Sequence, residues 1–534
     1  MRSSAAVLFG CWLLVAAAGA AAVSPPAGPV AGKTVGPGDR VEAFLGIPYA
    51  RPPVGPLRWQ APQPLDPWVE TRDATRPGPC CPQPKTFLRP VEGTQSEDCL
   101  YLNVWRPVPS VRSGRDLLPV MVWIHGGGFT TGGGSKPIYD GVVLARQGVI
   151  LVTINYRLGP FGFLAHPALS KESPHGVSGN YGLLDQIAAL RWIRHNIAAF
   201  GGDAERVTIF GESAGSVSVS CLLASPLAKG LFHRAIVQSG TADAIRTPLH
   251  SSKGDDDAKS MEQAGLAVAE RLDVSGQRPE DAAALRSKTA EELLSAANPK
   301  VGLFGRGTKF GPCVDGYVLP EPPRELSAAG RYNDVPVMIG TTANEGTLFT
   351  KFQLLIKRPL GYRWLLKRVF GEDAGDVEAL YPVESADDVP GQLERVVTAA
   401  CFTAPARRMA RSLAEQGRQP VYLYYFSRAC PYLVEQGLGA THGSDIFYVF
   451  GTAPKRFSTE VDDRLATAMQ GAWVRFAATG DPNGGDLPTW PPYSKAAERH
   501  LEWGEAVRVG TDLRRDECDL FDRVGVLPLQ DAND

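Results

Sequence analysis

The chain has 534 residues, of which 44% are hydrophobic and 21% charged, and its formal net charge at pH 7 is −2. This length and composition predict a globular protein with a large buried core. The near-neutral charge and the absence of a long basic run give no electrostatic basis for binding nucleic acid or an anionic membrane.

The first residues are typical of a secretory signal peptide. Arg2 supplies a positive charge, residues 5–18 are apolar, and small residues suited to cleavage follow. The apolar run is shorter than the roughly 20 residues that a spanning helix needs, so no stable membrane span is expected. Lipidation of Cys11 is an alternative, but cleavage before Cys11 would leave half of the apolar run on the mature protein. We therefore expect export, to the periplasm or the medium, with removal of residues 1–22.

Export would permit disulfides in the mature protein. Eight cysteines remain after Cys11, and none shows the paired spacing of a zinc site, so neither a metal nor another cofactor is expected. These cysteines are Cys80, Cys81, Cys99, Cys221, Cys313, Cys401, Cys430 and Cys518.

From residue 118 onward, runs typical of buried strands alternate with helical patterns. Because the apolar runs do not alternate strictly with polar residues, their strands are expected to be covered on both faces, as in a parallel sheet between helices. The alternation of strand and helix predicts an α/β fold. Strands are predicted within 118–128, 148–157, 206–216, 234–240, 335–342 and 419–426, and a long amphipathic helix over 185–200.

The region from about 350 to 415 has a helical pattern and interrupts the strand series. No repeat or long low-complexity linker divides the chain. We therefore predict a single domain over residues 23–534 with a helical excursion over the sheet.

The stretch "RVTIFGESAGS", residues 206–216, predicts a reactive serine. A β-branched run ends at Gly211, and Ser213 stands at the corner before a helix-compatible segment. This pattern matches the nucleophile elbow, in which a sharp strand-to-helix turn exposes the serine hydroxyl. Gly211 and Gly215 are expected because side chains there would collide with neighbouring backbone.

A serine nucleophile needs a base, and the base needs an orienting acid, which follow the elbow in the order acid and then histidine. Glu345 comes just after the strand-like run 335–342, whereas Asp315 precedes its own run and suits an Asp-Gly turn. Of the two histidines beyond Glu345, His442 lies in a glycine-flanked loop and His500 in a charged, surface-like segment. Glu345 and His442 are therefore the predicted acid and base.

The segment "WIHGGGF", residues 123–129, follows a predicted strand and supplies consecutive glycines. Such a loop can direct backbone N–H groups at the oxyanion of a tetrahedral intermediate, together with the N–H of the residue after the nucleophile. The predicted oxyanion donors are therefore Gly127, Gly128 and Ala214.

Together these motifs resemble the type-B carboxylesterase/lipase family, which includes carboxylesterases and cholinesterases. The similarity runs from about residue 40 to 522 and includes the blocks "FLGIPYARPPVGPLRW", "SEDCLYLNVW", "NYRLGPFGFL", "HGSDIFYVFG" and "WVRFAATGDPN". The resemblance implies an α/β-hydrolase fold with a mostly parallel central sheet flanked by helices. It also implies the same nucleophile, acid, base and oxyanion donors.

The resemblance adds further expectations. Ser239, in "QSG", resembles a serine beside the catalytic acid, with plain packing as the alternative. Cys81 and Cys99 resemble the family's first disulfide, although Cys80 could pair instead. A bridge between Cys401 and Cys518 would be similar to one in cholinesterases.

The predicted function is hydrolysis of small carboxylic esters through an acyl-enzyme on Ser213. Choline esters are not expected, because the stretch between Cys81 and Cys99 lacks the tryptophan that binds the quaternary ammonium in cholinesterases. A lipase acting on long-chain glycerides and a catalytically silent binding protein remain alternatives. The natural ester and the oligomeric state stay open.

Overall fold

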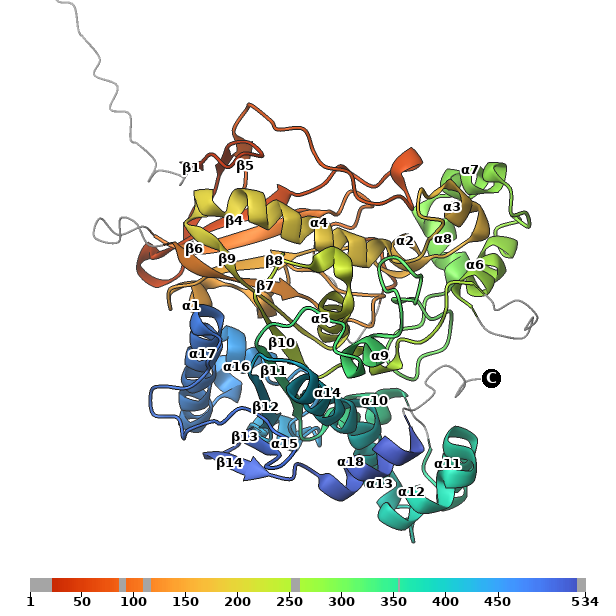
Figure 1. Cartoon of the computed structure of the whole chain (residues 1–534), viewed down its shortest axis with the longest axis vertical. Helices are drawn as coiled ribbons and strands as arrows, with labels where there is room; N and C mark the ends of the chain where they lie inside the picture. The colour runs from red at the N-terminus through yellow and green to blue at the C-terminus, as the bar shows by residue number, and fades with distance from the viewer. Residues whose placement is uncertain (1–21, 86–92, 109–116, 251–259, 354–355, 526–534) are drawn as a thin grey trace, which may run out of the picture.

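A computed structural model describes residues 22–85, 93–108, 117–250, 260–353 and 356–525, so nearly all of the predicted signal peptide lies outside the described residues. Within them, a large sheet of eleven strands crosses the molecule (Figure 1). Its strands are Lys33–Val35 (β3), Val41–Pro48 (β4), Tyr101–Pro107 (β6), Leu118–Ile124 (β7), Ile150–Ile154 (β8), Gly202–Glu212 (β9), Arg234–Gln238 (β10), Val337–Thr342 (β11), Val421–Phe426 (β12), Arg499–Trp503 (β13) and Val507–Thr511 (β14). A small second sheet joins Ala22–Val23 (β1), Val30–Ala31 (β2) and Arg72–Asp73 (β5).

The strand order of the large sheet is β14–β13–β12–β11–β10–β9–β7–β8–β6–β4–β3. All pairs from β8 to β13 are parallel, and the pairs at the two edges are antiparallel. This confirms the predicted mostly parallel α/β sheet, and each of the six predicted strands is present.

The strand β13 was not predicted, and the expectation for His500 was wrong. The charges of Arg499 and Glu502 gave this segment the look of a surface loop, but it pairs with β12 on one side and β14 on the other. His500 is buried there, against Gly510 of β14. Burial lowers its pKa below the ordinary value.

Helices cover both faces of the sheet. They are Val142–Ala145 (α1), Gly159–Phe163 (α2), Pro167–Glu172 (α3), Tyr181–Asn196 (α4), Ala214–Ala224 (α5), Met261–Glu270 (α6), Pro279–Ser287 (α7), Ala290–Ala297 (α8), Pro323–Ala328 (α9), Pro431–Glu435 (α15), Ile446–Phe450 (α16), Glu460–Thr479 (α17) and Arg515–Val524 (α18), besides the helices of the excursion described below.

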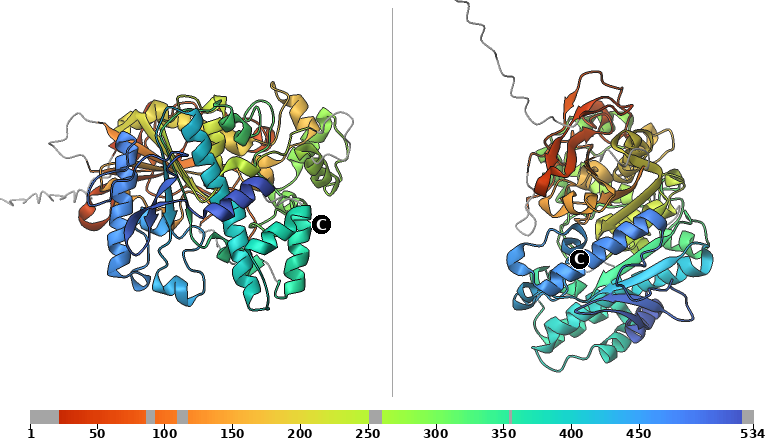
Figure 2. Two further views of the ribbon diagram at one scale, coloured as in Figure 1. Left: turned by 60° about the horizontal axis from the view of Figure 1, so that its bottom comes forward. Right: turned by 90° about the vertical axis from the view of Figure 1, so that its left-hand side faces the viewer.

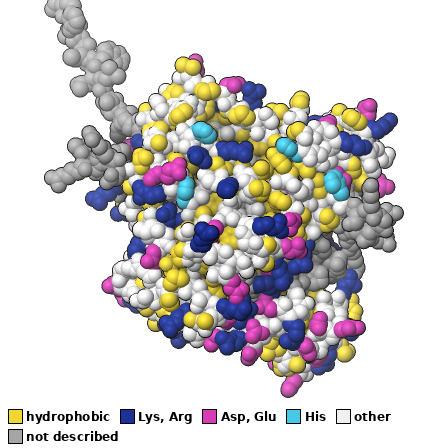
Figure 3. Space-filling view, viewed as in Figure 1, with side chains coloured by type: hydrophobic (Ala, Val, Ile, Leu, Met, Phe, Trp, Pro, Cys, Tyr) yellow, Lys and Arg dark blue, Asp and Glu magenta, His cyan; other side chains and the backbone are white. Residues whose placement is uncertain are grey.

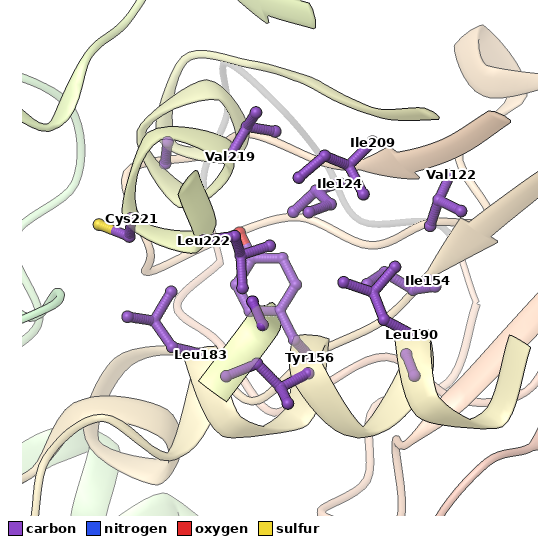
Figure 4. Packing of buried hydrophobic residues seen from close by; sticks show 14 of the residues in the cluster. Val122, Ile124, Ile154, Tyr156, Leu183, Leu190, Ile209, Val219, Cys221 and Leu222 are labelled. Atoms are coloured by element: carbon purple, nitrogen blue, oxygen red, sulfur yellow. The ribbon is translucent and has the colours of Figure 1, made fainter. Parts of the chain in front are cut away.

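Alternate residues of one strand enter different cores. Val122 and Ile124 of β7 pack with α4 and α5, as the close view of Figure 4 shows. Trp123 points to the opposite face, where it joins a second core with Trp473 of α17. Two-sided burial explains why the strand is apolar without alternation.

Between β11 and β12 the chain forms the predicted helical excursion. Its helices are Glu345–Gln353 (α10), Pro359–Phe370 (α11), Ala374–Leu380 (α12), Asp388–Thr398 (α13) and Ala404–Gln416 (α14), with a π-helical turn at Ala399–Thr403. Helices α11 to α13 share a hydrophobic cluster with Phe521 of α18. In both views of Figure 2 these helices lie at the lower edge of the molecule.

Positive and negative side chains are interspersed over the face shown in Figure 3, in keeping with the small net charge. Among the described helices, none is both long and apolar enough to cross a membrane.

Candidate active site

Ser213 occupies a strained corner between a strand and a helix. Strand β9 ends at Glu212 and helix α5 begins at Ala214, so the serine stands alone between them, with φ 57° and ψ −125°. Its N–H donates to the carbonyl oxygen of Gln238 on the neighbouring strand, at 3.0 Å. A non-glycine residue keeps such a conformation only when its surroundings enforce it, and such strain is common at active sites.

The two flanking glycines allow this corner, as the sequence predicted. A Cβ atom on Gly215 would lie 2.0 Å from the carbonyl oxygen of Ile124, and one on Gly211 would lie 2.6 Å from the backbone of Gly215. Both distances are far below any tolerable contact. The elbow therefore packs directly against the end of β7.

Glu345 and His442 are brought together from segments almost a hundred residues apart. Glu345 is the first residue of α10 and fully buried, and its Oε1 accepts the N–H of Thr342 at 2.7 Å. Its Oε2 lies 2.6 Å from Nδ1 of the buried His442. The adjoining loops are joined by the N–H of Asn344, which donates to the carbonyl of Ala440 at 3.0 Å. A carboxylate at Nδ1 orients the imidazole and leaves Nε2 to face the other side.

The rival acid, Asp315, has a different role. Its Oδ1 accepts the N–H groups of Tyr317, Val318 and Leu319, at 2.8–3.0 Å. Asp315 therefore holds a tight turn, as the Asp-Gly pattern indicated.

Sequence reasoning missed two features beside His442. Oε1 of the buried Glu212 lies 3.1 Å from Nε2 of His442. The rings of Phe349 and Phe402 each lie 5.0 Å from the imidazole, between centroids. The position of Glu212, directly before Ser213 on the same strand, was the signal that could have identified it.

A third buried carboxyl group, on Asp445, was also missed. Its Oδ2 accepts hydrogen bonds from Nε2 of Gln238, at 2.9 Å, and from the hydroxyl of Tyr424, at 3.0 Å. Burial, together with the negative charge of Glu212, raises its pKa to about 7. Asp445 is therefore largely protonated below neutral pH.

The glycine loop predicted as an anion site lies against the serine. A Cβ atom on Gly126 would come 3.0 Å from the Cβ of Ser213. Gly127 and Gly128 have φ values of 120° and 64°, and the carbonyl of Gly127 accepts the N–H of Thr131, at 3.0 Å.

This conformation leaves backbone donors beside Ser213. Among the described residues, no acceptor pairs with the N–H groups of Gly127, Gly128 or Ala214. The loop can therefore offer N–H groups to an anion that forms next to the serine.

Ser239 lies at the end of β10, and its N–H donates to Gly340 of β11, the strand that leads to Glu345. Its buried hydroxyl has no hydrogen-bond partner among the described residues. The serine is therefore close to the strand of the acid without bonding to the acid itself.

The predicted disulfides are not formed in this structure, since all eight described cysteines are free thiols. Cys81 and Cys99 are nevertheless neighbours, and their side chains share a hydrogen bond. The sulfur of Cys81 also accepts the N–H of Leu158, at 3.2 Å. Cys401 and Cys518 contribute to one hydrophobic cluster as separate thiols. The described residues contain no group of three or more His, Cys, Asp or Glu side chains arranged to bind a metal.

Comparison with known proteins identifies the family over most of the chain. Residues 20–521 match the model of the carboxylesterase family. The chain is 41% identical to a fumonisin B1 esterase of Sphingopyxis macrogoltabida, over 89% of this chain and 85% of the relative. It is 38% identical to a para-nitrobenzyl esterase of Bacillus subtilis (88% and 93%) and 35% identical to carboxylesterase 1C of Mus musculus (89% and 87%).

Two solved structures of a PNB esterase superpose with TM-scores of 0.77 and 0.78, each at 36% identity, over 93% of this chain and 99% of that one. These structures share the α/β-hydrolase fold, which confirms the predicted fold class. The chain therefore belongs to the carboxylesterase family and is a carboxylic ester hydrolase.

Proposed function

We infer that this hydrolase cleaves small carboxylic esters through an acyl-enzyme on Ser213. The observation that carries the proposal is the short contact of 2.6 Å between Glu345 and Nδ1 of His442, next to a strained serine. Nε2 of His442 is 3.1 Å from Glu212, the residue that precedes Ser213, so the imidazole faces the elbow.

In the proposed reaction the oxygen of Ser213 attacks the ester carbonyl while Nε2 of His442 takes the hydroxyl proton. Glu345 stabilises the resulting imidazolium. The negative oxygen of the tetrahedral intermediate accepts hydrogen bonds from the N–H groups of Gly127, Gly128 and Ala214. The imidazolium then gives its proton to the leaving alcohol. Water, activated by the same histidine, releases the acid and regenerates the serine.

The test compares the wild type with Ser213→Ala on p-nitrophenyl esters of increasing acyl length, below and above their solubility limits. Loss of at least about 10⁴-fold in kcat is expected for the variant. A variant with near-normal turnover would refute the assignment. Activity that appears only with emulsified long esters would support the lipase alternative, and a folded but inactive wild type would support a silent binding protein.

We also propose that the protein is exported. The support is the order of features in the first 22 residues: a positive charge, an apolar run and then small residues. N-terminal sequencing of protein from the medium or periplasm should begin near residue 23. Retention of Met1 in the cell-associated protein would contradict export by a cleaved signal.

A further inference from the structure

The helix α11 has apolar side chains on its outer face. Its inner residues Tyr362, Leu366 and Phe370 are buried in the core of the excursion. Leu360 and Trp364 lie one turn apart on the other side and are 78% and 59% exposed. Because residues four apart share a helix face, these two side chains form a continuous apolar stripe in contact with solvent.

Exposed apolar residues are also frequent in this part of the sequence. Nine large hydrophobic side chains are exposed among the described residues, and three of them fall between residues 352 and 364: Phe352, Leu360 and Trp364. Scattered exposed apolar residues need no explanation, whereas the adjacent pair Leu360 and Trp364 on one face of α11 indicates a contact surface.

Basic residues precede and follow the stripe along the chain, up to the acidic pair Glu372 and Asp373. Between Gly346 and Gly371 the sequence has basic residues at Lys351, Lys357, Arg358, Arg363, Lys367 and Arg368, and no acidic residue. Arg363 is paired with Glu378, at 2.6 Å, and the guanidinium of Arg368 lies 5.5 Å from the ring of Trp364. The near-neutral charge of the whole chain conceals this local excess.

We propose that the outer face of α11 docks on a lipid surface with anionic headgroups. The docking surface consists of Leu360, Trp364, Lys357, Arg358 and Lys367, all exposed. Leucine and tryptophan insert at the boundary between headgroups and acyl chains, and lysine and arginine bind the headgroup phosphates. Each basic residue near such a surface adds attraction that salt screens.

Charge decides between a lipid surface and a second copy of the chain. A two-fold dimer through α11 would place this basic face against itself, because a symmetric interface pairs the same patch from both subunits. Like charges would then oppose each other around the apolar stripe. An anionic surface is complementary both to the charge and to the stripe.

The docking surface belongs to the same helical excursion as Glu345. Helix α11 packs in one cluster with α13. Thr398, the last residue of α13, accepts the N–H of Gly346, next to Glu345, at 2.9 Å. If the proposed function holds, docking would bring the enzyme to esters dissolved in or adsorbed to the lipid.

The experiment measures binding of the whole protein to vesicles by flotation, so that its result does not depend on ester turnover. Phosphatidylcholine vesicles are compared with vesicles in which about one lipid in three is phosphatidylglycerol. The wild type is expected to bind only the anionic vesicles and to dissociate at high salt. Two double variants, Leu360→Ala/Trp364→Ala and Lys357→Glu/Lys367→Glu, should each lose at least about tenfold in affinity for the anionic vesicles.

Matched controls make the same kinds of substitution at exposed residues outside the docking surface. Val69→Ala shortens another highly exposed hydrophobic residue, and Lys33→Glu/Lys229→Glu makes the same total charge change at other exposed lysines. Both controls should bind like the wild type, and all variants should hydrolyse a soluble ester normally. Absence of wild-type binding, equal binding to both vesicles, or equal weakening by the controls would overturn the proposal. So would self-association at high protein concentration that Leu360→Ala/Trp364→Ala abolishes.

Discussion

Glu212 gives the site a second carboxylate next to its histidine. Oε1 of Glu212 lies 3.1 Å from Nε2 of His442, on the side opposite Glu345. In the proposed reaction, a negative charge at this distance would stabilise the imidazolium that forms as Ser213 attacks the ester. Glu212→Gln is therefore expected to reduce kcat about tenfold and to move the acidic limb of the kcat/KM profile to lower pH, because the imidazole protonates less readily.

The pH profile separates this electrostatic role from a structural one. Glu270→Gln, which changes an exposed carboxylate on α6, serves as the control and should leave both kcat and the profile unchanged. A loss of activity in Glu212→Gln without movement of the acidic limb would contradict the electrostatic role.

The pKa of Asp445, raised to about 7, predicts a pH-dependent stability. An unfolded aspartate ionises near pH 4, so the folded state holds one more proton between pH 4 and 7, and stability falls as the pH rises through this window. Above pH 7 the loss is complete and amounts to the order of 4 kcal/mol.

Asp445→Asn cannot ionise and should lack this component. Urea unfolding at a series of pH values should show the free energy of unfolding of the variant, relative to that of the wild type, increasing from pH 4 to 7 and then levelling. A constant difference across this range would show that Asp445 does not titrate in the folded state.

At the scale of the element, two adjacent glycines of the loop after β7 predict different outcomes. A Cβ atom on Gly127 would lie 1.9 Å from the carbonyl oxygen of Thr131, whereas one on Gly128 meets no atom within 4 Å. Gly127→Ala must displace the loop and its N–H groups, so kcat should fall about 100-fold. Gly128→Ala meets no neighbouring atom and retains the backbone N–H donor. It adds only strain of about 1 kcal/mol, because the φ of this residue is positive.

Steady-state kinetics of the two variants, beside thermal melts, would check this contrast. Equal losses of kcat would contradict an oxyanion role that depends on loop geometry.

Of the large sheet, strands β7 to β12 could be predicted from the sequence, whereas β3, β4, β6, β13 and β14 were not predicted. The continuous apolar runs of β7 and β8 indicated their burial directly. Strand β13 reads "RHLEW", and its charged residues gave no sign of a strand. Its partners are β12, which lies far earlier in the chain, and β14, the strand that follows it. Pairing of this kind depends on tertiary context more than on local composition.

For the candidate site, chain order and strand ends predicted Ser213, Glu345 and His442, and the structure brings Glu345 into contact with His442. The same rules could not identify Phe402 or Asp445, because their proximity to the site depends on how helices pack. Phe402 reaches His442 from the π-helical turn at Ala399–Thr403, whose position no sequence pattern indicated. The pKa of Asp445 is likewise raised by its burial and by the charge of Glu212, which depend on the fold.

At the scale of the whole molecule, one edge of the sheet assembles the site. Strands β9, β10 and β11 are parallel neighbours, so their carboxyl ends lie together. Ser213 follows β9, Ser239 follows β10 and Glu345 follows β11. The sheet thus places three distant positions of the chain at one edge. His442 lies in a loop that is hydrogen-bonded to Asn344 through the carbonyl of Ala440.

A bridge between Cys81 and Cys99, both free thiols in the structure, stays a prediction that depends on the compartment of the protein. The structure brings the two thiols into hydrogen-bond contact in a buried setting. If the protein is exported, oxidation would close a loop of about 20 residues and add roughly 3 kcal/mol of stability. Alkylation of denatured, exported protein should leave two of its eight mature cysteines protected, and reduction should lower Tm by several degrees.

Single variants identify the partner. Cys81→Ser should expose every remaining thiol to alkylation, whereas Cys80→Ser should keep the protected pair. The reverse pattern would show that Cys80 pairs in place of Cys81. Full alkylation of wild-type protein recovered after export would refute the bridge and leave these cysteines as buried thiols. Burial raises the pKa of the Cys80 thiol to about 11.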